Sequence, residues 1–138
     1  MSGLVLDADI ALGWCFEDRG DAYSDSVLEA LREERGFVPG HWMLELTNVL
    51  QGAQKRQILS EADVGHFLEL VRELPIETDG EAALRAADQT RLLARSHGLS
   101  TYEAAYLELA MRRSASLATR NAGLRAAARR CGVTLVEV

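Results

Sequence analysis

The stretch Leu4-Val5-Leu6-Asp7-Ala8-Asp9 decides the fold class, because an uninterrupted apolar run stops at an acid near the start of the chain. A short apolar run bounded by polar residues is typical of a strand that is buried on both faces. A second such run, Ser116-Leu117-Ala118-Thr119, is followed closely by Asn121. We therefore expect two buried strands with polar side chains at their carboxyl ends.

The rest of the chain alternates helical patterns with short extended pieces. Apolar residues recur at helical spacing, Ser60 is a suitable helix N-cap, and Gly98 is placed to end a helix. The expected helices cover residues 24–34, 42–56, 60–74, 79–97, 100–110 and 122–130, and further extended pieces cover residues 36–39 and 133–136. Strands separated by helices predict a parallel sheet covered on both faces. We therefore expect one domain over residues 1–138, a three-layer α/β/α sandwich around a central parallel sheet.

The composition is that of an acidic globular protein of 138 residues, with 15 Lys and Arg against 21 Asp and Glu and a formal net charge of −6. The longest apolar run, Ile10 to Phe16, is far shorter than the roughly 20 residues that cross a bilayer. No secretion signal is expected, since Asp7 and Asp9 interrupt the N-terminal apolar stretch. Two isolated cysteines, Cys15 and Cys131, suit a reducing compartment. These features predict a cytoplasmic protein without membrane contact.

Charge is distributed unevenly along the chain. Residues 1–103 hold 9 Lys and Arg and 19 Asp and Glu, whereas residues 104–138 hold six arginines and two glutamates. The six arginines are Arg112, Arg113, Arg120, Arg125, Arg129 and Arg130. A net negative charge argues against non-specific binding of nucleic acid, but a local arginine surface can face phosphate groups. A solvated helix face explains the same arginines equally well.

Several acids are candidates for chemistry, and each has a structural alternative. Asp7 and Asp9 follow the first strand, where one can bind a metal or act as a nucleophile and either can cap the next helix. Glu45 lies at the edge of the apolar stripe of the helix over residues 42–56, where a half-buried carboxylate needs a pairing arginine or a cation. The motif Ser100-Thr101-Tyr102-Glu103 matches a capping box.

These acids form a set of oxygen donors that the expected fold can bring together: Asp7, Asp9, Glu45 and Glu103. Hard cations such as Mg²⁺ and Mn²⁺ prefer oxygen donors. A site of this kind suits the metal-assisted attack of water on a phosphodiester. The three histidines lack the spacing of metal ligands and are interpreted as structural: His41, His66 and His97.

Several segments resemble those of PIN-domain ribonucleases, specifically the toxin half of VapBC-type toxin–antitoxin pairs. Leu4-Val5-Leu6-Asp7-Ala8 resembles the opening that ends in the first catalytic aspartate. The segment from Trp42 to Leu50 resembles the one that carries the second acid, here Glu45. The segment from Leu99 to Ala110 is the most specific match. A final segment, Leu117-Ala118-Thr119-Arg120-Asn121 with the helix after it, resembles the last strand and its acid.

The resemblance implies Mg²⁺- or Mn²⁺-dependent cleavage of RNA, homodimerisation, and an antitoxin whose tail enters the active-site groove. The catalytic positions that it implies are Asp7, Glu45, Glu103 and Asn121, and the expected metal ligands are Asp7, Asp9, Glu45 and Glu103. The expected substrate contacts are Thr119, Arg120, Arg112, Arg113 and Arg125. The resemblance changes the interpretation of Glu103 from a helix cap to a metal-site candidate.

Three positions depart from the family pattern. Glu103 stands where the family has Asp, Asn121 replaces an acid, and Asp9 replaces the usual Ser or Thr. One acid is lost and another gained, so four carboxylates remain. Our hypothesis is that Asp9 compensates for Asn121 and that the metal site moves toward the first strand.

Two other functions fit the same residues. The altered acids are compatible with a PIN-fold protein that has lost cleavage and keeps dimerisation or partner binding. Asp7-Ala8-Asp9 also resembles the opening of the haloacid-dehalogenase-type phosphatases, with Asp7 as nucleophile and Asp9 as acid and base. Those enzymes need a later phosphate-binding lysine, and the only lysine, Lys55, does not follow a predicted strand.

Overall fold

A central parallel sheet organises the molecule, whose computed structural model describes residues 3–16 and 20–137. The described strands are β1 (Leu4–Leu6), β2 (Gly36–Val38), β3 (Ile76–Thr78) and β4 (Ser116–Ala118). They pair in parallel in the order β3-β2-β1-β4. The two strands at opposite ends of the sequence, β1 and β4, are therefore neighbours. A hydrogen bond of 3.0 Å from Asp7 N to Ala118 O extends this pairing to the carboxyl end of β1.

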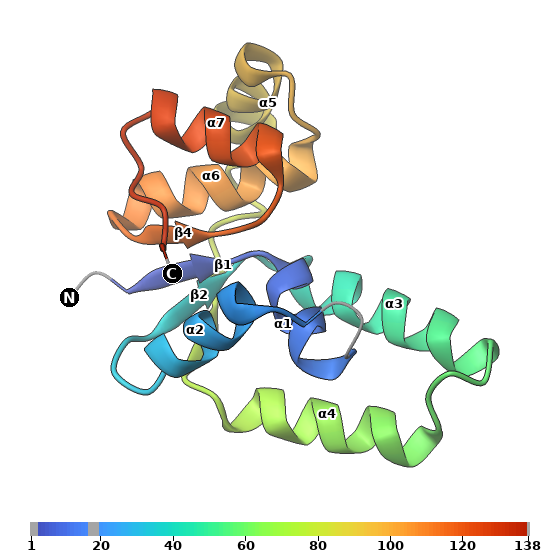
Figure 1. Ribbon diagram of the computed structural model, residues 1–138. Coiled ribbons are helices and arrows are strands. Elements are labelled where there is room, and N and C mark those ends of the chain that lie inside the picture. The colour runs from blue at the N-terminus through green and yellow to red at the C-terminus, as the bar shows by residue number, and fades with distance from the viewer. Residues whose placement is uncertain (1–2, 17–19, 138) are drawn as a thin grey trace.

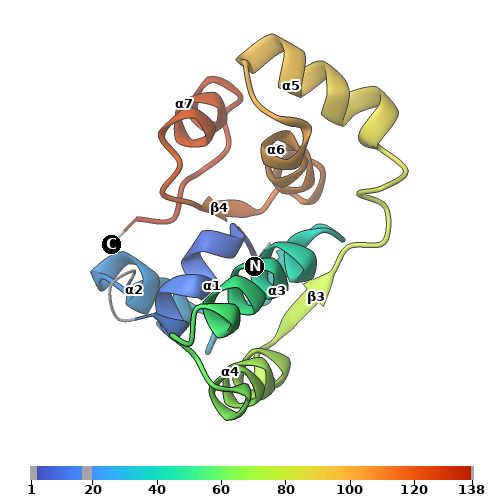
Figure 2. The same ribbon diagram turned by 90° about the vertical axis from the view of Figure 1, so that its right-hand side faces the viewer.

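Helices cover both faces of the sheet, as Figures 1 and 2 show. One layer holds α1 (Ala8–Cys15), α2 (Ala22–Ala30), α3 (Trp42–Lys55) and α4 (Glu61–Glu73). The opposite layer holds the π-helical turn η2 (Ala86–Thr90), α5 (Arg91–His97), α6 (Thr101–Arg113) and α7 (Ala122–Arg130). The predicted three-layer sandwich is thus confirmed. None of the described helices is long and apolar enough to cross a membrane.

The core lies where β1 and β4 meet helix α6. All three residues of β1 are buried, and Leu107 and Leu109 of α6 and Leu117 of β4 are buried in the same cluster. Burial of apolar side chains is the dominant stabilising term in such a core. The core therefore holds in place the two strand ends that carry Asp7 and Asn121.

Local signals in the sequence set several helix ends as expected. Ser60 and Ser100 each form a capping box, with Asp63 and Glu103 at the third helical position. Gly98 follows α5 with φ of 64°, a left-handed conformation that glycine adopts without steric cost. These features need only neighbouring residues, which is why the pattern predicts them.

The structure differs from the sequence prediction where long-range contacts intervene. Strand β3 was not predicted, since its half-buried and exposed residues give no continuous apolar run. The helix expected over residues 79–97 is replaced by turns, then by η2 and α5. The strand expected over residues 133–136 is reduced to a single bridge between Leu117 and Leu135. The helix expected over residues 24–34 is α2, which begins and ends earlier.

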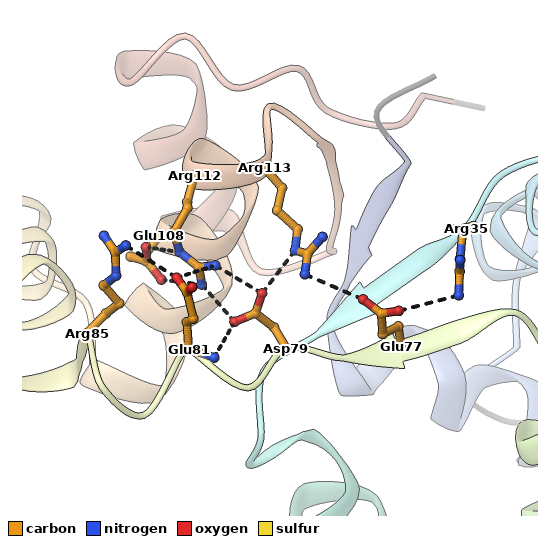
Figure 3. Close-up of polar contacts among 8 residues, drawn as sticks. All are labelled: Arg35, Glu77, Asp79, Glu81, Arg85, Glu108, Arg112 and Arg113. Carbon is orange, nitrogen blue, oxygen red and sulfur yellow. Dashed lines mark hydrogen bonds and ion pairs between the residues drawn. The ribbon is translucent and has the colours of Figure 1, made fainter.

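A buried network of charges explains why no helix begins at Asp79 (Figure 3). The carboxylate of Asp79, whose side chain is 2% exposed, accepts hydrogen bonds of 2.9 and 3.0 Å from Arg112 and one of 2.9 Å from Arg113. Arg112 also donates to Glu108 at 2.8 Å. The guanidinium groups fix the chain after β3 against α6, so its path is set by α6 and not by local helix propensity.

Candidate functional site

A cavity of about 620 Å³ lies at the carboxyl ends of β1 and β4. It is lined by Asp7, Asp9, Glu45, Ser100, Tyr102, Glu103, Tyr106, Arg120 and Asn121. All four acids proposed from the sequence therefore line one cavity, together with Asn121 and one of the six C-terminal arginines. In parallel α/β sheets, ligands bind outside the carboxyl ends of the strands, and this cavity lies at that position.

Asp7 is the most buried acid of the cavity. It is the N-cap of α1, and its Oδ1 accepts a long hydrogen bond of 3.4 Å from Asp9 N. The hydroxyl of the buried Thr119 donates to Asp7 Oδ2 at 2.7 Å. Burial raises the pKa of Asp7, and the nearby carboxylates of Glu45 and Asp9 raise it further. Of the two acids that follow β1, Asp7 is therefore the one that caps the helix.

Glu45 projects from the first turn of α3 into the same cavity. The hydroxyl of Tyr106 donates to Glu45 Oε1 at 2.6 Å, and His41 Nε2 lies 3.2 Å from the same oxygen. Burial raises the pKa of Glu45, but the contacts with His41 and Tyr106 outweigh burial and hold it below its ordinary value. The partners of this carboxylate are thus a tyrosine and a histidine, and no arginine in the described part of the chain pairs with it.

Glu103 combines the two roles proposed for it. Ser100 Oγ accepts from Glu103 N at 3.0 Å, and Ser100 N donates to Glu103 Oε1 at 2.8 Å, which completes the capping box. The hydrogen bond from Ser100 N, aided by that from Asn121, lowers the pKa of Glu103. The carboxylate also lines the cavity. The capping bond uses one oxygen, so the side chain still reaches the cavity.

Asn121 holds Glu103 in place. Its Oδ1 accepts from Leu124 N at 2.9 Å and caps α7, so its amide nitrogen is the group that faces Glu103. Asn121 Nδ2 donates to Glu103 Oε2 at 2.8 Å. An aspartate at position 121 would place a second anionic oxygen about as close to Glu103 Oε2 as Asn121 Nδ2 is now, at 2.8 Å. The two departures from the family pattern, Glu103 and Asn121, are therefore complementary to each other.

Arg120 balances the charge of Asp9 at the rim of the cavity. Its Nη1 lies 3.1 Å from Asp9 Oδ2, and its Nε and Nη2 donate to Asp21 at 2.8 and 2.7 Å. Its Nη2 also contacts Ser24. A Cβ at Gly13 would lie 3.1 Å from that nitrogen, so glycine leaves room for the guanidinium. Arg120 is shared between Asp9 and Asp21, so it offsets part of the charge of Asp9, and the compensation of Asn121 by Asp9 stays a prediction.

The structure separates the remaining expected substrate contacts from the cavity lining. Arg112 and Arg113 do not line this cavity and are engaged in the network of Figure 3. Arg125 donates to Thr119 O at 2.8 Å and pairs with Glu137 at 3.5 Å. Thr119 lies behind Asp7 and acts through that carboxylate. Arg120 is the member of this set that lines the cavity.

Sequence reasoning overlooked two side chains that position Glu45. Tyr106 lies within the matching segment from Leu99 to Ala110 without a signal of its own, and His41 is interpreted from the sequence as structural. Each lies at a spacing that puts it on the same helix face as an acid, Tyr106 three residues after Glu103 and His41 four residues before Glu45. This spacing was the available signal. The pairing of Tyr106 with Glu45 requires the tertiary fold, because α6 and α3 lie in opposite layers of the sandwich.

The donor chemistry of the cavity fits a hard divalent cation. Within the described residues, no three His, Cys, Asp or Glu side chains are grouped closely enough to hold a metal ion by themselves. Mg²⁺ usually keeps several waters and is bound by one or two carboxylates together with substrate phosphate. Asp7, Glu45 and Glu103 supply carboxylates of this type around one space. Burial raises the pKa of Asp7, the charges of Glu45 and Asp9 raise it further, and a bound cation would offset these charges.

Comparison with known proteins places the fold. The structure is similar to that of PAE2754 from Pyrobaculum aerophilum, with a TM-score of 0.68 and 18% identity, over 91% of this chain and 78% of that one. It is similar to FitAcB from Neisseria gonorrhoeae, with a TM-score of 0.55 and 18% identity, over 97% of this chain and 96% of that one. No curated protein sequence matches the chain. The model of the PIN domain matches residues 4–130, which removes the phosphatase alternative and shows that the chain belongs to the PIN domain family.

Proposed function

We propose that the protein is a metal-dependent endoribonuclease that hydrolyses RNA phosphodiester bonds. Members of the PIN domain family are typically nucleases, and the chain belongs to this family. The observation that carries the proposal is the cavity at the strand ends, where Asp7, Glu45 and Glu103 meet from three distant parts of the sequence. Bringing several carboxylates together costs free energy unless a bound cation or substrate offsets their repulsion.

The chain's own residues hold these carboxylates in a defined arrangement. Thr119 orients Asp7, Tyr106 orients Glu45, and Asn121 orients Glu103. We assign Mg²⁺ or Mn²⁺ to Asp7, Glu45 and Glu103, with Asp9 at the rim. A divalent cation held there activates water and neutralises charge that develops on the phosphate. Arg120 is the cationic side chain of the cavity and is the proposed contact to a phosphate oxygen.

The test is cleavage of a panel of single-stranded and structured RNAs in Mg²⁺ and in Mn²⁺. We expect cleavage by the parent protein and its loss in Asp7→Asn, because the buried carboxylate is replaced by a neutral amide of equal size. Asp88→Asn, an exposed acid outside the cavity, is the matched control and should cleave like the parent. Cleavage that persists at the parental rate in Asp7→Asn would contradict the assignment.

A second function is favoured by the amide at position 121. Asn121 brings no negative charge and uses both amide atoms in holding α7 and Glu103. These contacts give Asn121 a structural role without a charge, which is compatible with a PIN-fold module that binds a partner and does not cleave RNA. Absence of cleavage in either metal, across a broad panel, would favour the binding module over the nuclease.

We further propose that the protein acts in the cytoplasm as the toxin of a type II toxin–antitoxin pair, as a homodimer inhibited by an antitoxin. The segment resemblance to VapBC toxins supports this proposal. A small reading frame directly upstream would encode the candidate antitoxin. We expect its product to form a stable complex with this chain in size-exclusion chromatography and to suppress cleavage. Cleavage that is unchanged at saturating antitoxin would contradict the pairing.

A further inference from the structure

Two large apolar side chains lie exposed beside the acid cavity. The side chain of Tyr102 is 64% exposed and that of Leu44 is 71% exposed. Tyr102 follows the N-cap of α6 by two residues, and Leu44 immediately precedes Glu45 on α3. Exposed apolar side chains that gather at a cavity commonly mark a binding site.

These side chains form part of a second cavity, of about 580 Å³, that adjoins the first. It is lined by His41, Leu44, Glu45, Thr47, Asn48, Gln51 and Tyr102. Glu45 and Tyr102 line both cavities, so the two spaces share a wall. The side-chain amides of Asn48 and Gln51 supply hydrogen-bond donors and acceptors on the exposed face of α3.

The ring of Tyr102 packs against a group of rings that reaches the acids. The ring of His41 meets it edge to face, with centroids 5.3 Å apart, and meets Tyr106 in the same way at 5.3 Å. Tyr106 in turn donates to Glu45 at 2.6 Å. A chain of packed rings thus links the exposed tyrosine to the carboxylate and limits the freedom of its ring.

We infer that the second cavity is a subsite for one unpaired nucleobase of the RNA, next to the scissile phosphate, with Tyr102 as the residue on which the base stacks. This inference rests on the proposed nuclease function. The base stacks on Tyr102 and contacts Leu44, while Asn48 and Gln51 face its polar edge. Single-stranded RNA is recognised in this manner, by stacking on aromatic rings and hydrogen bonds to base edges. A base within a duplex is stacked between its neighbours, so it has no exposed ring face that can stack on Tyr102.

The features of the cavity favour a base over a protein segment as its occupant. A smaller apolar cavity of about 270 Å³ shares His41, Leu44 and Tyr102 with this one. The amides of Asn48 and Gln51 line the second cavity alone, and one aromatic wall beside two amides matches the mixed polarity of a single base. Because the two cavities share a wall, a base bound in the second cavity lies beside the carboxylates of the first. This arrangement suits the short sugar–phosphate link between a base and the scissile bond.

The test is a binding measurement without turnover. Fluorescence anisotropy of a labelled single-stranded oligoribonucleotide of mixed sequence is measured in Ca²⁺, with gel analysis to verify that the strand stays intact. The same strand annealed to its complement is the second probe. The variants are Tyr102→Ala, Tyr102→Phe and Met111→Ala, the last being an exposed apolar control on the same helix outside both cavities. Circular dichroism verifies that each variant is folded.

We expect Tyr102→Ala to weaken binding of the single strand by about tenfold, because base stacking on an aromatic ring is lost. Tyr102→Phe keeps the ring and should stay within about twofold of the parent, as should Met111→Ala. The duplex should bind more weakly than the single strand. In cleavage assays, the KM of Tyr102→Ala should rise more than its kcat falls.

Three results would overturn the inference: equal binding by Tyr102→Ala and Met111→Ala, equal binding of duplex and single strand, or no binding of single-stranded RNA by the parent. Binding of a protein partner alone that depends on Tyr102 would assign the cavity to that partner instead. The binding assay needs no catalysis, so its result is separable from the nuclease proposal. Cleavage that depends on Asp7 with no effect of Tyr102→Ala would keep the nuclease and reject the subsite.

Discussion

At the scale of single residues, the site depends on neutral side chains that hold its acids. Thr119, Tyr106 and Asn121 each bond to one carboxylate, at 2.7, 2.6 and 2.8 Å. Hydrogen bonds to an ionised carboxylate are stronger than those between neutral groups and favour the charged form. Replacement of any of these three side chains should therefore shift the pKa of the carboxyl group that it contacts, while the fold is kept.

Thr119→Val removes the hydroxyl that donates to Asp7. Burial already raises the pKa of Asp7, and the hydrogen bond from Thr119 opposes that rise. We expect the pKa to increase further, so the acidic limb of the pH–rate profile moves to higher pH. Thr119→Ser, which keeps the hydroxyl, should leave the limb close to that of the parent. An unchanged limb in Thr119→Val would show that Asp7 does not govern it.

Asn121→Asp keeps the cap of α7 and replaces the amide that faces Glu103 with a carboxylate oxygen. We expect a higher pKa for Glu103, a metal-free protein that is less stable by about 1 kcal/mol, and tighter binding of Mg²⁺. Carboxyl NMR titration, denaturant unfolding and calorimetric metal titration measure these three quantities. Asn121→Ser is the matched control, since serine also caps a helix and adds no charge. Mg²⁺ affinity equal to that of Asn121→Ser would argue against a cation near this residue.

Asp9→Ser tests whether this acid compensates for Asn121. Arg120 lies 3.1 Å from Asp9 and already balances its charge, so we expect Mg²⁺ affinity to fall by no more than about threefold. A loss well beyond about a hundredfold would show that Asp9 is a direct ligand, because residues that only support the ligands cost up to about a hundredfold. If neither Asp9→Ser nor Asn121→Asp changes metal binding, the compensation hypothesis fails.

At the scale of secondary-structure elements, a charge network joins the end of β3 to α6 (Figure 3). Asp79 forms ion pairs with both Arg112 and Arg113, and Arg112 also pairs with Glu108. The Asp79 and Glu108 side chains are almost fully buried. A buried charge that loses its partner is strongly destabilising. The network therefore ties the sheet edge to the helix that carries Glu103 and Tyr106.

The network should make stability depend on pH. Hydrogen bonds from Arg112 and Arg113 lower the pKa of Asp79 to about 2. A lowered carboxyl pKa stabilises the folded protein above the unfolded value near 4, and that contribution is lost as the pH falls through about 2. We expect a loss of about 2 kcal/mol in unfolding free energy across this range, measured by denaturant unfolding.

Asp79→Asn should remove this contribution and the negative charge between two arginines, which then keep Glu108 and Glu77 as their acidic partners. We expect a loss of about 3 kcal/mol at neutral pH and a flatter dependence of stability on pH below about 4. Glu33→Gln, an exposed acid, is the matched control. A pH dependence in Asp79→Asn that equals that of the parent would assign acid sensitivity to other carboxylates.

At the scale of the whole molecule, the formal charge of −6 is reconciled with an RNA substrate by where the charges lie. Acids line the cavity, and Arg120 is the cationic side chain that lines it with them. Arg120 also pairs with Asp9 and Asp21. The other C-terminal arginines that pair with acids of this chain are Arg112, Arg113 and Arg125. Few cations are thus placed to meet phosphates, and the proposed divalent cation would supply the missing positive charge.

Binding of single-stranded RNA should therefore depend on divalent cations and only weakly on salt. Each phosphate neutralised by a side chain contributes a slope of roughly −0.7 to log K against log salt. With Arg120 as the main contact, we expect a slope of about −1 in anisotropy titrations over a range of KCl concentrations. A slope several times steeper would point to a broader arginine surface.

The sequence by itself determined the features that depend on neighbouring residues. The apolar runs of β1 and β4, the capping boxes at Ser60 and Ser100, and the glycine after α5 all appear in the structure. The acids at the strand ends also follow from sequence, since the carboxyl ends of adjacent parallel strands meet at one edge of the sheet. Short-range hydrogen bonds and apolar periodicity carry this information.

Only the tertiary structure decided which side chains hold the acids. Tyr106 meets Glu45 across 61 positions, and Arg112 meets Asp79 across 33, and no local pattern specifies either pair. The same long-range contacts replaced the helix expected from residue 79, and they separated Arg112 and Arg113 from the cavity. Hydrogen bonds and ion pairs act over a few ångströms in space, so their partners are fixed only once the layers have packed.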